Sequence, residues 1–277
     1  MQTKTGFASI NGAQIYYELA GTGQPLVLLH AGVADGRLWD DQFAPFAKHY
    51  RTIRYDLRGF GRSPMPSGRF SHHDDLAGLL DFLQVDRAIV VGLSFGGKVA
   101  IDFALAYPQR VTALVLGAPS IGGAVPTERI LQFWEDEETA VENGDINAAV
   151  ELNLRLWVDG LQRQPDEVNS VVRQKVGEMQ REIFLMDVPE DAAEMRLEPV
   201  AYGRLAEITA PTLVLVGDLD LPEKVEEAAW LAQQMPHAQH TVMPGVAHML
   251  NMEKPAQFNQ LVLDFLQGKS GTQRGTE

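Results

Sequence analysis

One serine of this chain stands in a setting that suits a nucleophile. Ser94 is the centre of the run Gly-Leu-Ser-Phe-Gly at 92–96. The apolar run 88–91 before it predicts a buried strand, and residues 97–107 have the apolar spacing of a helix that ends before Pro108. A sharp strand-to-helix turn holds a serine in a strained conformation with its hydroxyl exposed. Flanking glycines fit such a turn, because side chains there would collide where strand and helix meet.

The pattern alone is a hypothesis, because an ordinary tight turn can also contain a serine between glycines. A serine hydroxyl is a weak nucleophile until a base takes its proton and a carboxylate orients that base. Candidates for both follow later strands. The apolar run 211–216 leads into a glycine followed by Asp218 and Asp220, and the run 239–243 leads into a loop with His248. The carboxyl ends of parallel strands are where catalytic side chains converge.

Strand-like and helical patterns alternate along most of the chain, which is typical of a parallel sheet with crossover helices. Asn11-Gly12 joins the runs 7–10 and 14–18 and predicts a hairpin. Further strands are predicted at 25–29, 51–55, 88–91, 112–116, 211–216 and 239–243, and helices at 37–48, 71–84, 97–107, from Pro222 and at 255–266. The predicted fold class is therefore α/β, with a mostly parallel eight-stranded sheet flanked by helices.

The stretch 120–205 interrupts this alternation. Its apolar residues recur at the spacing of helices, and no run within it has a convincing strand pattern. We therefore expect an all-helical cap inserted into a core domain formed by residues 1–119 and 206–267. The polar tail 268–277 is predicted to be disordered.

Composition argues against several classes of protein. A formal net charge of -14 disfavours a nucleic-acid partner, because phosphate binding needs a basic face. No apolar run is long enough to span a membrane, and the N-terminus lacks the apolar core of a signal peptide. The absence of cysteine excludes disulfides and thiolate chemistry and is compatible with a cytoplasmic location. No dinucleotide-binding, Walker or metal-ligand spacing occurs, so neither a cofactor nor a metal is expected.

Acidic residues gather at 135–138 and at Glu223, Glu226 and Glu227. We predict that both groups are solvated helix surface, the usual setting of charge runs. At most they disfavour anionic substrates weakly. Four arginines of the expected cap are predicted to be solvated as well, and do not by themselves indicate an anion clamp: Arg155, Arg163, Arg173 and Arg181.

Four spaced motifs resemble those of the α/β-hydrolase superfamily, in its order and over about residues 7–267. They are the turn around Ser94, an Asp-x-Arg-Gly-x-Gly-x-Ser loop at 56–63, the acid loop 217–220 and the histidine loop 245–248. The resemblance implies the fold of that superfamily and a catalytic triad of Ser94, His248 and an aspartate. In similar loops the working carboxylate is the third residue after the glycine, which favours Asp220. Asp218 is then a supporting residue that stabilises the turn.

The resemblance also implies an oxyanion hole made of two backbone N–H groups. One belongs to Phe95, directly after the nucleophile. The other comes from the turn after the strand 25–29, where many relatives carry His-Gly. This chain has His30, Ala31 and Gly32, so Gly32 is the candidate and Val33 the alternative. We interpret His30 as a structural hydrogen-bonding residue.

Arg58 and Asp56, in the second motif, have two interpretations. They could clamp a substrate, or they could fix the loop that follows their strand. The resemblance favours the second interpretation.

A serine nucleophile separates the chain from haloalkane dehalogenases and epoxide hydrolases, which use aspartate there. The predicted function is hydrolysis of small carboxylic esters through an acyl-enzyme, with Val33, Trp134 and Trp157 touching the substrate under the cap. A lactonase is the alternative, because residues 30–35 and 39–42 resemble the turn and helix of enol-lactone hydrolases. Carbon–carbon bond hydrolases and cofactor-free perhydrolases use the same serine, histidine and aspartate and are further alternatives. The alternative that is not primarily an enzyme is a ligand-binding receptor with slow turnover.

Overall fold

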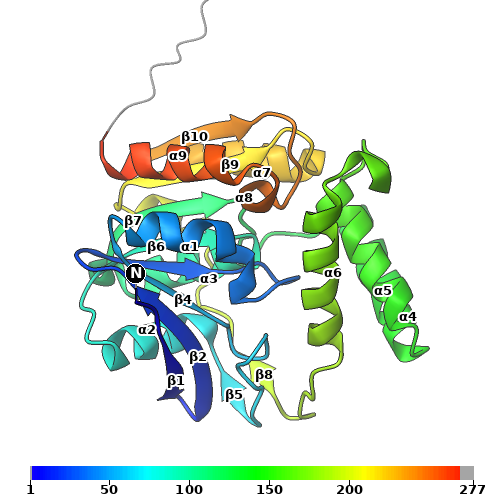
Figure 1. The fold of residues 1–277 in the computed structure, drawn as a ribbon, viewed down its shortest axis with the longest axis horizontal. Coiled ribbons are helices and arrows are strands. Elements are labelled where there is room, and N and C mark those ends of the chain that lie inside the picture. The colour runs from blue at the N-terminus through cyan, green and yellow to red at the C-terminus, as the bar shows by residue number, and fades with distance from the viewer. Residues whose placement is uncertain (1, 269–277) are drawn as a thin grey trace, which may run out of the picture.

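The computed structural model describes residues 2–268 of the chain. Its centre is an eight-stranded sheet with the order β1-β2-β4-β3-β6-β7-β9-β10 (Figure 1). The strands are β1 (Lys4–Ile10), β2 (Ala13–Ala20), β3 (Pro25–Leu29), β4 (Arg51–Tyr55), β6 (Ala88–Leu93), β7 (Val111–Gly117), β9 (Thr212–Gly217) and β10 (Ala238–Met243). β2 is antiparallel to both of its neighbours, and all other pairs are parallel. The predicted mostly parallel sheet is confirmed.

The first two strands form the predicted hairpin. Ile10 pairs with Ala13 across the turn, and Asn11 and Gly12 have φ values of 47° and 79°. Two successive left-handed residues match the twist of the strands that they join, which is why Asn-Gly is favoured there. The hairpin extends the parallel part of the sheet on the side of β4.

Helices cover both faces of the sheet, and the alternation of side chains along each strand sends neighbours into different cores. On β3, Val27 and Leu29 pack into one core, whereas Leu26 and Leu28 pack into the other. The first core is covered by α2 (His72–Phe82), α3 (Phe95–Ala106) and α7 (Pro222–Gln234); the second by η1 (Gly36–Trp39), α1 (Asp40–Ala47), α8 (Leu250–Glu253) and α9 (Pro255–Leu266). Burial on both faces explains the continuous apolar runs of the central strands.

The chain between β7 and β9, which we call the inserted segment (residues 118–211), stands beside the sheet in Figure 1. Its main elements are α4 (Glu128–Glu142), α5 (Ile146–Asn153), the π-helical turn η3 (Leu154–Asp159) and α6 (Ser170–Phe184). Short turns of 3-10 helix occur within it at η4 (Pro165–Glu167) and η5 (Leu205–Glu207), and a further one, η2 (Pro108–Arg110), lies in the core between α3 and β7. The backbone N–H of Tyr202 donates to the carbonyl of Gly122 at 2.9 Å, so the chain leaves and rejoins the core side by side.

The inserted segment departs from the all-helical expectation at one point. A two-residue strand, β8 (Ala193–Glu194), pairs in parallel with β5 (Arg69–Phe70), outside the main sheet. A ladder of two residues has no periodicity that a sequence pattern could reveal. Lys98 of α3 adds an ion pair to Glu194 at 3.1 Å, which fastens this strand to the core.

The predicted disordered tail concerns residues 268–277, of which 269–277 lie outside the described residues. Among residues 2–268, no helix is both long enough and apolar enough to cross a lipid bilayer.

Candidate active site

Ser94 lies between β6 and α3 in a backbone conformation that few residues other than glycine adopt, with φ 52° and ψ -111°. Such a conformation costs about 1–3 kcal/mol and persists only where its surroundings hold it. The N–H of Ser94 donates to the carbonyl of Gly117 at 2.8 Å, and its carbonyl accepts from the N–H groups of Lys98 and Ser120 at 3.0 and 3.1 Å. These bonds hold the serine at the mouth of the turn, where its side chain lines a cavity of about 780 Å³.

Two glycines permit this turn. A Cβ on Gly96 would collide with the carbonyl oxygen of Leu29 in β3, and a Cβ on Gly92 would collide with the carbonyl of Gly96. The helix therefore begins directly against the strands. Its first residue, Phe95, has an N–H group with no acceptor inside the helix, as the first turn of any helix does. The positive end of the α3 dipole adds to the attraction of this turn for an anion.

His248 and Asp220 form a buried pair at the ends of β10 and β9. The Nδ1 of His248 lies 2.8 Å from Oδ2 of Asp220, and the two side chains are 2% and 1% exposed. The other carboxylate oxygen, Oδ1, accepts from the N–H of Leu221 at 2.8 Å. A carboxylate placed in this way fixes the imidazole ring and stabilises its protonated form. His248 also lines the cavity that Ser94 lines.

Asp218 has a different position. Its side chain is exposed, and its Oδ1 accepts from the N–H of Gly245 at 2.5 Å. This bond joins the loop after β9 to the loop after β10. The structure therefore pairs the histidine with Asp220 and uses Asp218 to connect the two loops.

The turn after β3 is braced by His30, which is fully buried. Its Nδ1 lies 2.8 Å from the carbonyl of Ala31, and its Nε2 accepts from the N–H of Leu57 at 2.9 Å. Burial lowers the pKa of His30, so the ring is neutral and uses one nitrogen as donor and the other as acceptor. Gly32 follows within this braced turn and faces Phe95, because a Cβ on Gly32 would stand 3.5 Å from the Cβ of Phe95.

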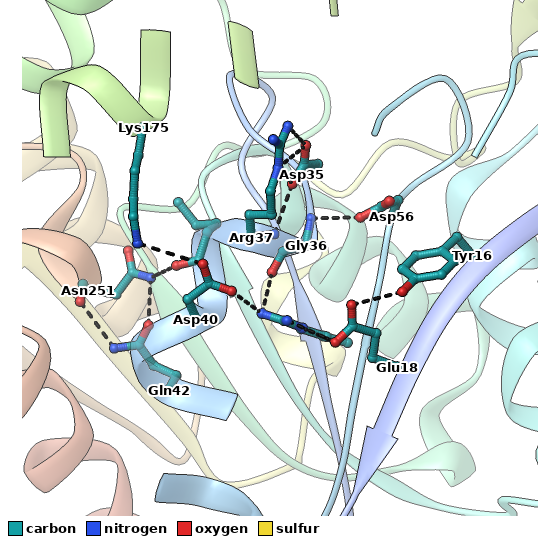
Figure 2. Close-up of polar contacts among 12 residues, drawn as sticks. Tyr16, Glu18, Asp35, Gly36, Arg37, Asp40, Gln42, Asp56, Lys175 and Asn251 are labelled. Carbon is teal, nitrogen blue, oxygen red and sulfur yellow. Dashed lines mark hydrogen bonds and ion pairs between the residues drawn. The ribbon is translucent and has the colours of Figure 1, made fainter. Parts of the chain in front are cut away.

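Figure 2 shows the polar contacts behind this turn. The two carboxylate oxygens of Asp56 accept from the N–H groups of Gly36 and Arg62, each at 2.8 Å. Asp35 is the N-cap of η1 and is paired with Arg37 at 2.6 Å. Burial raises the pKa of Asp56, whereas hydrogen bonds from Arg37 hold the pKa of Asp35 below its usual value although burial opposes them. The loop carboxylates thus act as structural acceptors.

A second set of contacts joins the turn to other parts of the site. Gln42 of α1 donates to the carbonyl of Asn251 at 3.1 Å, and Asn251 donates to Gln42 at 3.0 Å, which holds the helix after His248 (Figure 2). Lys175 of α6 reaches Asp40 at 3.7 Å. The inserted segment is therefore tied to the same elements that carry the turn.

Arg58 is removed from the cavity by a buried ion pair. Its Nε and Nη2 atoms donate to the two oxygens of Asp75 at 2.7 and 2.8 Å, and both side chains are 2% exposed. Nη2 also donates to the carbonyl of Asn11 at 3.0 Å. Of the two interpretations, loop fixation agrees with these contacts, because Arg58 is buried and does not line the cavity.

The chain matches the model of the alpha/beta hydrolase family over residues 26–261. This chain belongs to the alpha/beta hydrolase family. It is 30% identical to a pimeloyl-[acyl-carrier protein] methyl ester esterase of Pectobacterium atrosepticum, over 92% of this chain and 99% of the relative. It is 32% identical to a 2-hydroxy-6-oxononadienedioate/2-hydroxy-6-oxononatrienedioate hydrolase of Burkholderia vietnamiensis, over 91% of each. Among solved structures, the enol-lactonase from Burkholderia xenovorans is similar, with a TM-score of 0.76 and 25% identity over 94% of this chain and 99% of that one.

The predicted site residues of this alpha/beta hydrolase lie around one cavity. Ser94, Phe95, Gly32, Val33, Trp134, Trp157 and His248 all line it, and Asp220 lies behind His248. Trp157 covers the histidine, with ring centroids 4.7 Å apart, and Phe133 packs against Trp157 edge-on at 5.8 Å. Trp134 is half-exposed. Within the described residues, no group of three acidic or histidine side chains is arranged to hold a metal ion.

The prediction for the acidic clusters is wrong in part. Glu135, Asp136 and Glu138 are exposed, as expected, but Glu137 is partly buried and lines the cavity of the hydrolase. Glu223, Glu226 and Glu227 of α7 line it as well. A run of charges on a helix also has a side that faces inward, and only the packing of α4 against α5 decides which residue occupies it.

Three of the four arginines named in the sequence analysis form ion pairs within the protein. Arg155 and Arg173 both bind Asp159 at 2.9 Å, and Arg163 binds Glu253 at 2.5 Å. None of these arginines lines the cavity. Arg163 and Arg173 are therefore structural links and not the solvated side chains that we expected, whereas Arg155 is partly exposed and Arg181 is exposed, as expected. Since Arg181 does not line the cavity either, the four arginines offer no anion clamp to a substrate there.

Sequence reasoning missed two further polar residues of the cavity wall, Asn153 and Gln180. Both are at least nine-tenths buried, with exposures of 2% and 4%. A signal was present in the sequence, since each amide follows apolar residues on a helix face that is predicted to be buried. An amide on such a face is either satisfied inside the protein or available to a ligand.

Proposed function

We propose that this alpha/beta hydrolase cleaves small carboxylic esters by a serine mechanism with an acyl-enzyme intermediate. Ser94 is the nucleophile, His248 the general base and acid, and Asp220 the residue that orients the imidazole. The N–H groups of Phe95 and Gly32 bind the oxyanion. The buried contact of 2.8 Å between His248 and Asp220, beside a serine with φ 52° on the same cavity, is the observation that carries this proposal.

The proposed reaction has two halves. Ser94 attacks the ester carbonyl while its proton passes to Nε2 of His248, and the negative charge that forms on the carbonyl oxygen is bound by the two N–H groups. The imidazolium then gives its proton to the departing alcohol, which leaves the acyl group on Ser94. A water molecule, deprotonated by the same histidine, releases the acid and restores the serine.

We propose that residues 120–205 act as a cap over a core formed by 1–119 and 206–267. Support comes from the cavity, whose wall combines Ser94 and His248 of the core with Trp134 and Trp157 of the inserted segment. Val33 completes the apolar wall beside Gly32. An apolar wall of this kind favours acyl groups with an apolar chain next to the ester carbonyl.

A lactone is the second candidate substrate, because the similar structure from Burkholderia xenovorans is an enol-lactonase. The same attack by Ser94 would open a lactone ring, with the alcohol remaining attached to the acyl group. Carbon–carbon cleavage of a dicarboxylate, which the name of the Burkholderia vietnamiensis relative describes, receives less support. Four glutamates line the cavity, and its lysine, Lys224, is already paired with Glu227 at 2.6 Å.

The test is steady-state hydrolysis of p-nitrophenyl esters and lactones by the wild type and by Ser94→Ala. We expect multiple turnovers with acetyl to hexanoyl esters, and a loss of at least about a thousandfold in kcat for Ser94→Ala. Preferential turnover of lactones would replace the ester by the second candidate. A folded wild type that hydrolyses neither class faster than Ser94→Ala would contradict the proposal, and slow single turnover would favour a receptor.

A further inference from the structure

Three helices of the inserted segment each place one polar side chain on the otherwise largely apolar wall of the cavity. These are Glu137 of α4, Asn153 at the end of α5 and Gln180 of α6. Their neighbours on the wall are Ile130, Phe133, Trp134, Trp157, Ile183 and Phe184. Polar groups in such surroundings are costly unless something satisfies them.

Asn153 supplies no free donor to this wall. Its Nδ2 donates to Oε1 of Glu137 at 2.5 Å and to the carbonyl of Ala149 at 2.9 Å, which uses both of its hydrogens. The amide therefore holds the Glu137 carboxylate in place. Within residues 2–268, no hydrogen bond reaches the second carboxylate oxygen, Oε2. Burial raises the pKa of Glu137, although the bond from Asn153 lowers it.

Gln180 provides a second acceptor. The side chain is 4% exposed, and its Oε1 is buried without a hydrogen-bond partner among the described residues. A buried amide oxygen without a partner is destabilising, and an apolar residue of the same shape would avoid that loss. Because Gln180 lines the cavity, its amide brings to the wall this acceptor and a donor, Nε2, that makes no hydrogen bond within residues 2–268.

The charges around the cavity point to the same class of ligand. Glu223, Glu226 and Glu227 also line it, and Lys224 is engaged by Glu227 at 2.6 Å and by the hydroxyl of Ser120 at 3.3 Å. A carboxylate entering this cavity would meet the negative charge of the glutamates, with Nε2 of Gln180 as an amide donor. A hydroxyl, an amide N–H or an ammonium group would meet two acceptors that have no donor within residues 2–268, Oε2 of Glu137 and Oε1 of Gln180.

We propose that Glu137 and Gln180 form an acceptor subsite, which binds a hydrogen-bond-donating group on the part of the substrate that is not cleaved. Asn153 is a positioning residue that holds Glu137. The inference rests on the proposed function, because it takes the ligand to be an ester or lactone cleaved at Ser94. The subsite selects substrates with a hydroxyl, amide or ammonium tail and rejects those with a carboxylate tail.

The kinetic test uses four p-nitrophenyl esters of one chain length: hexanoate, 6-hydroxyhexanoate, 6-aminohexanoate and the monoester of adipate. For the wild type we expect kcat/KM for the hydroxyl or ammonium ester to exceed that for the adipate ester by at least about tenfold. In Glu137→Gln this ratio should fall about tenfold, because the new amide also donates to a carboxylate. If kcat/KM is raised for the hydroxyl ester but not for the ammonium ester, the subsite binds a neutral donor. If it is raised for the ammonium ester but not for the hydroxyl ester, the subsite binds a cation.

The matched control is Glu138→Gln, one residue along the same helix and exposed to solvent. It removes the same charge from the molecule without touching the cavity wall, so the ratio should remain that of the wild type. Equal kcat/KM for all four esters in the wild type would overturn the subsite. An equal fall of the ratio in Glu137→Gln and Glu138→Gln would also overturn it, because the effect would then come from net charge.

Gln180→Met supplies a readout that does not depend on turnover. If the amide oxygen of Gln180 has no partner until a ligand binds, methionine at this position should raise Tm by about 2–4 °C. It should also weaken the binding of molecules whose tail donates a hydrogen bond. If Gln180 serves the fold, the same change should lower Tm, and this outcome would overturn its role. Binding is measured with hexylammonium, 1-hexanol and hexanoate by tryptophan fluorescence, because Trp134, Trp157 and Trp230 line the cavity.

These measurements separate the two proposals. Failure of the wild type to hydrolyse p-nitrophenyl hexanoate faster than Ser94→Ala would contradict the serine esterase. The fluorescence titration still decides on the subsite in that case. Tighter binding of hexylammonium or hexanol than of hexanoate supports it, and equal or reversed affinities overturn it.

Discussion

Asp218 and Asp220 belong to one loop and have opposite surroundings. Asp220 is buried against His248, whereas Asp218 is exposed and bonds the backbone of Gly245. We predict that Asp220→Asn lowers kcat by about a thousandfold or more with little loss of stability, because the amide no longer orients and stabilises the imidazolium. Asp218→Asn should leave kcat within about threefold and lower stability by about 1 kcal/mol at most. Ester kinetics and urea unfolding of both variants measure this; the reverse ranking would transfer the role to Asp218.

His72 is a buried base beside the proposed oxyanion site. Its side chain is 4% exposed, packs edge-on to Phe70 and Phe95 at 5.2 Å, and has no partner for Nδ1 among the described residues. Burial lowers its pKa to about 3. The unfolded chain therefore takes up a proton as the pH falls through the ordinary range near 6.5, while the folded chain stays unprotonated until about pH 3.

The free energy of unfolding is therefore unaffected by His72 above pH 6.5. It decreases as the pH falls from 6.5 towards 3, because only the unfolded chain binds the proton in that range. We predict that His72 alone contributes about 1.4 kcal/mol of lost stability per pH unit below about pH 6. His72→Phe should reduce the pH dependence of the free energy of unfolding by that amount between about pH 5.5 and 4. Urea titrations of both proteins at several pH values test this. Parallel curves would mean that His72 is accessible to protons in the folded state.

At the scale of elements, α3 can approach β3 this closely only because Gly96 has a hydrogen atom in place of a side chain. Because a Cβ on Gly96 would collide with the backbone of Leu29, Gly96→Ala must move the helix or the strand. We predict a loss of about 3 kcal/mol or more in the free energy of unfolding. Gly122→Ala is the matched control, since its Cβ would stand 3.5 Å from the nearest atom, Oδ1 of Asp102. It should change stability by less than about 1 kcal/mol, and equal losses in both variants would refute the close approach.

Most elements could be predicted from the sequence because their signals are local. The apolar runs of β3, β6 and β9 lie within or next to their predicted ranges, and Asn11-Gly12 marks the hairpin. The short pairing of β5 with β8 could not be predicted, because two residues define no period. The predicted helix 37–48 is divided in the structure into η1 and α1.

The polar part of the site shows where sequence reasoning ends. The turn around Ser94, the acid loop and the histidine loop could be located because each follows a strand. Glu137 was assigned to solvent with its neighbours, because its burial depends on Asn153, which approaches from another helix. The unpartnered Oε1 of Gln180 likewise follows from how α6 packs, which no local pattern encodes.

At the scale of the whole molecule, the net charge of -14 repels anions and attracts cations that approach the protein. We predict that raising the ionic strength from about 0.01 to 0.15 M increases kcat/KM for the adipate monoester about twofold to fivefold. The 6-aminohexanoate ester should show a decrease, and the uncharged hexanoate ester should show neither. Initial rates at low substrate concentration measure the three slopes. If kcat/KM depends on ionic strength in the same way for all three esters, salt acts on the enzyme itself and not on the association of enzyme and substrate.

The hydrogen bond between Tyr202 and Gly122 places the two ends of the inserted segment next to each other, so the segment can be exchanged as a unit. The segment from about residue 123 to 201 departs and returns at one point on the core, so its length can change without altering the register of β7 and β9, as long as the pairing of β8 with β5 is kept. An exchange of the proposed cap at these two residues would leave the proposed catalytic residues of the core in place. A transplant between homologues, joined at these two residues, would carry the donor's substrate preference with it.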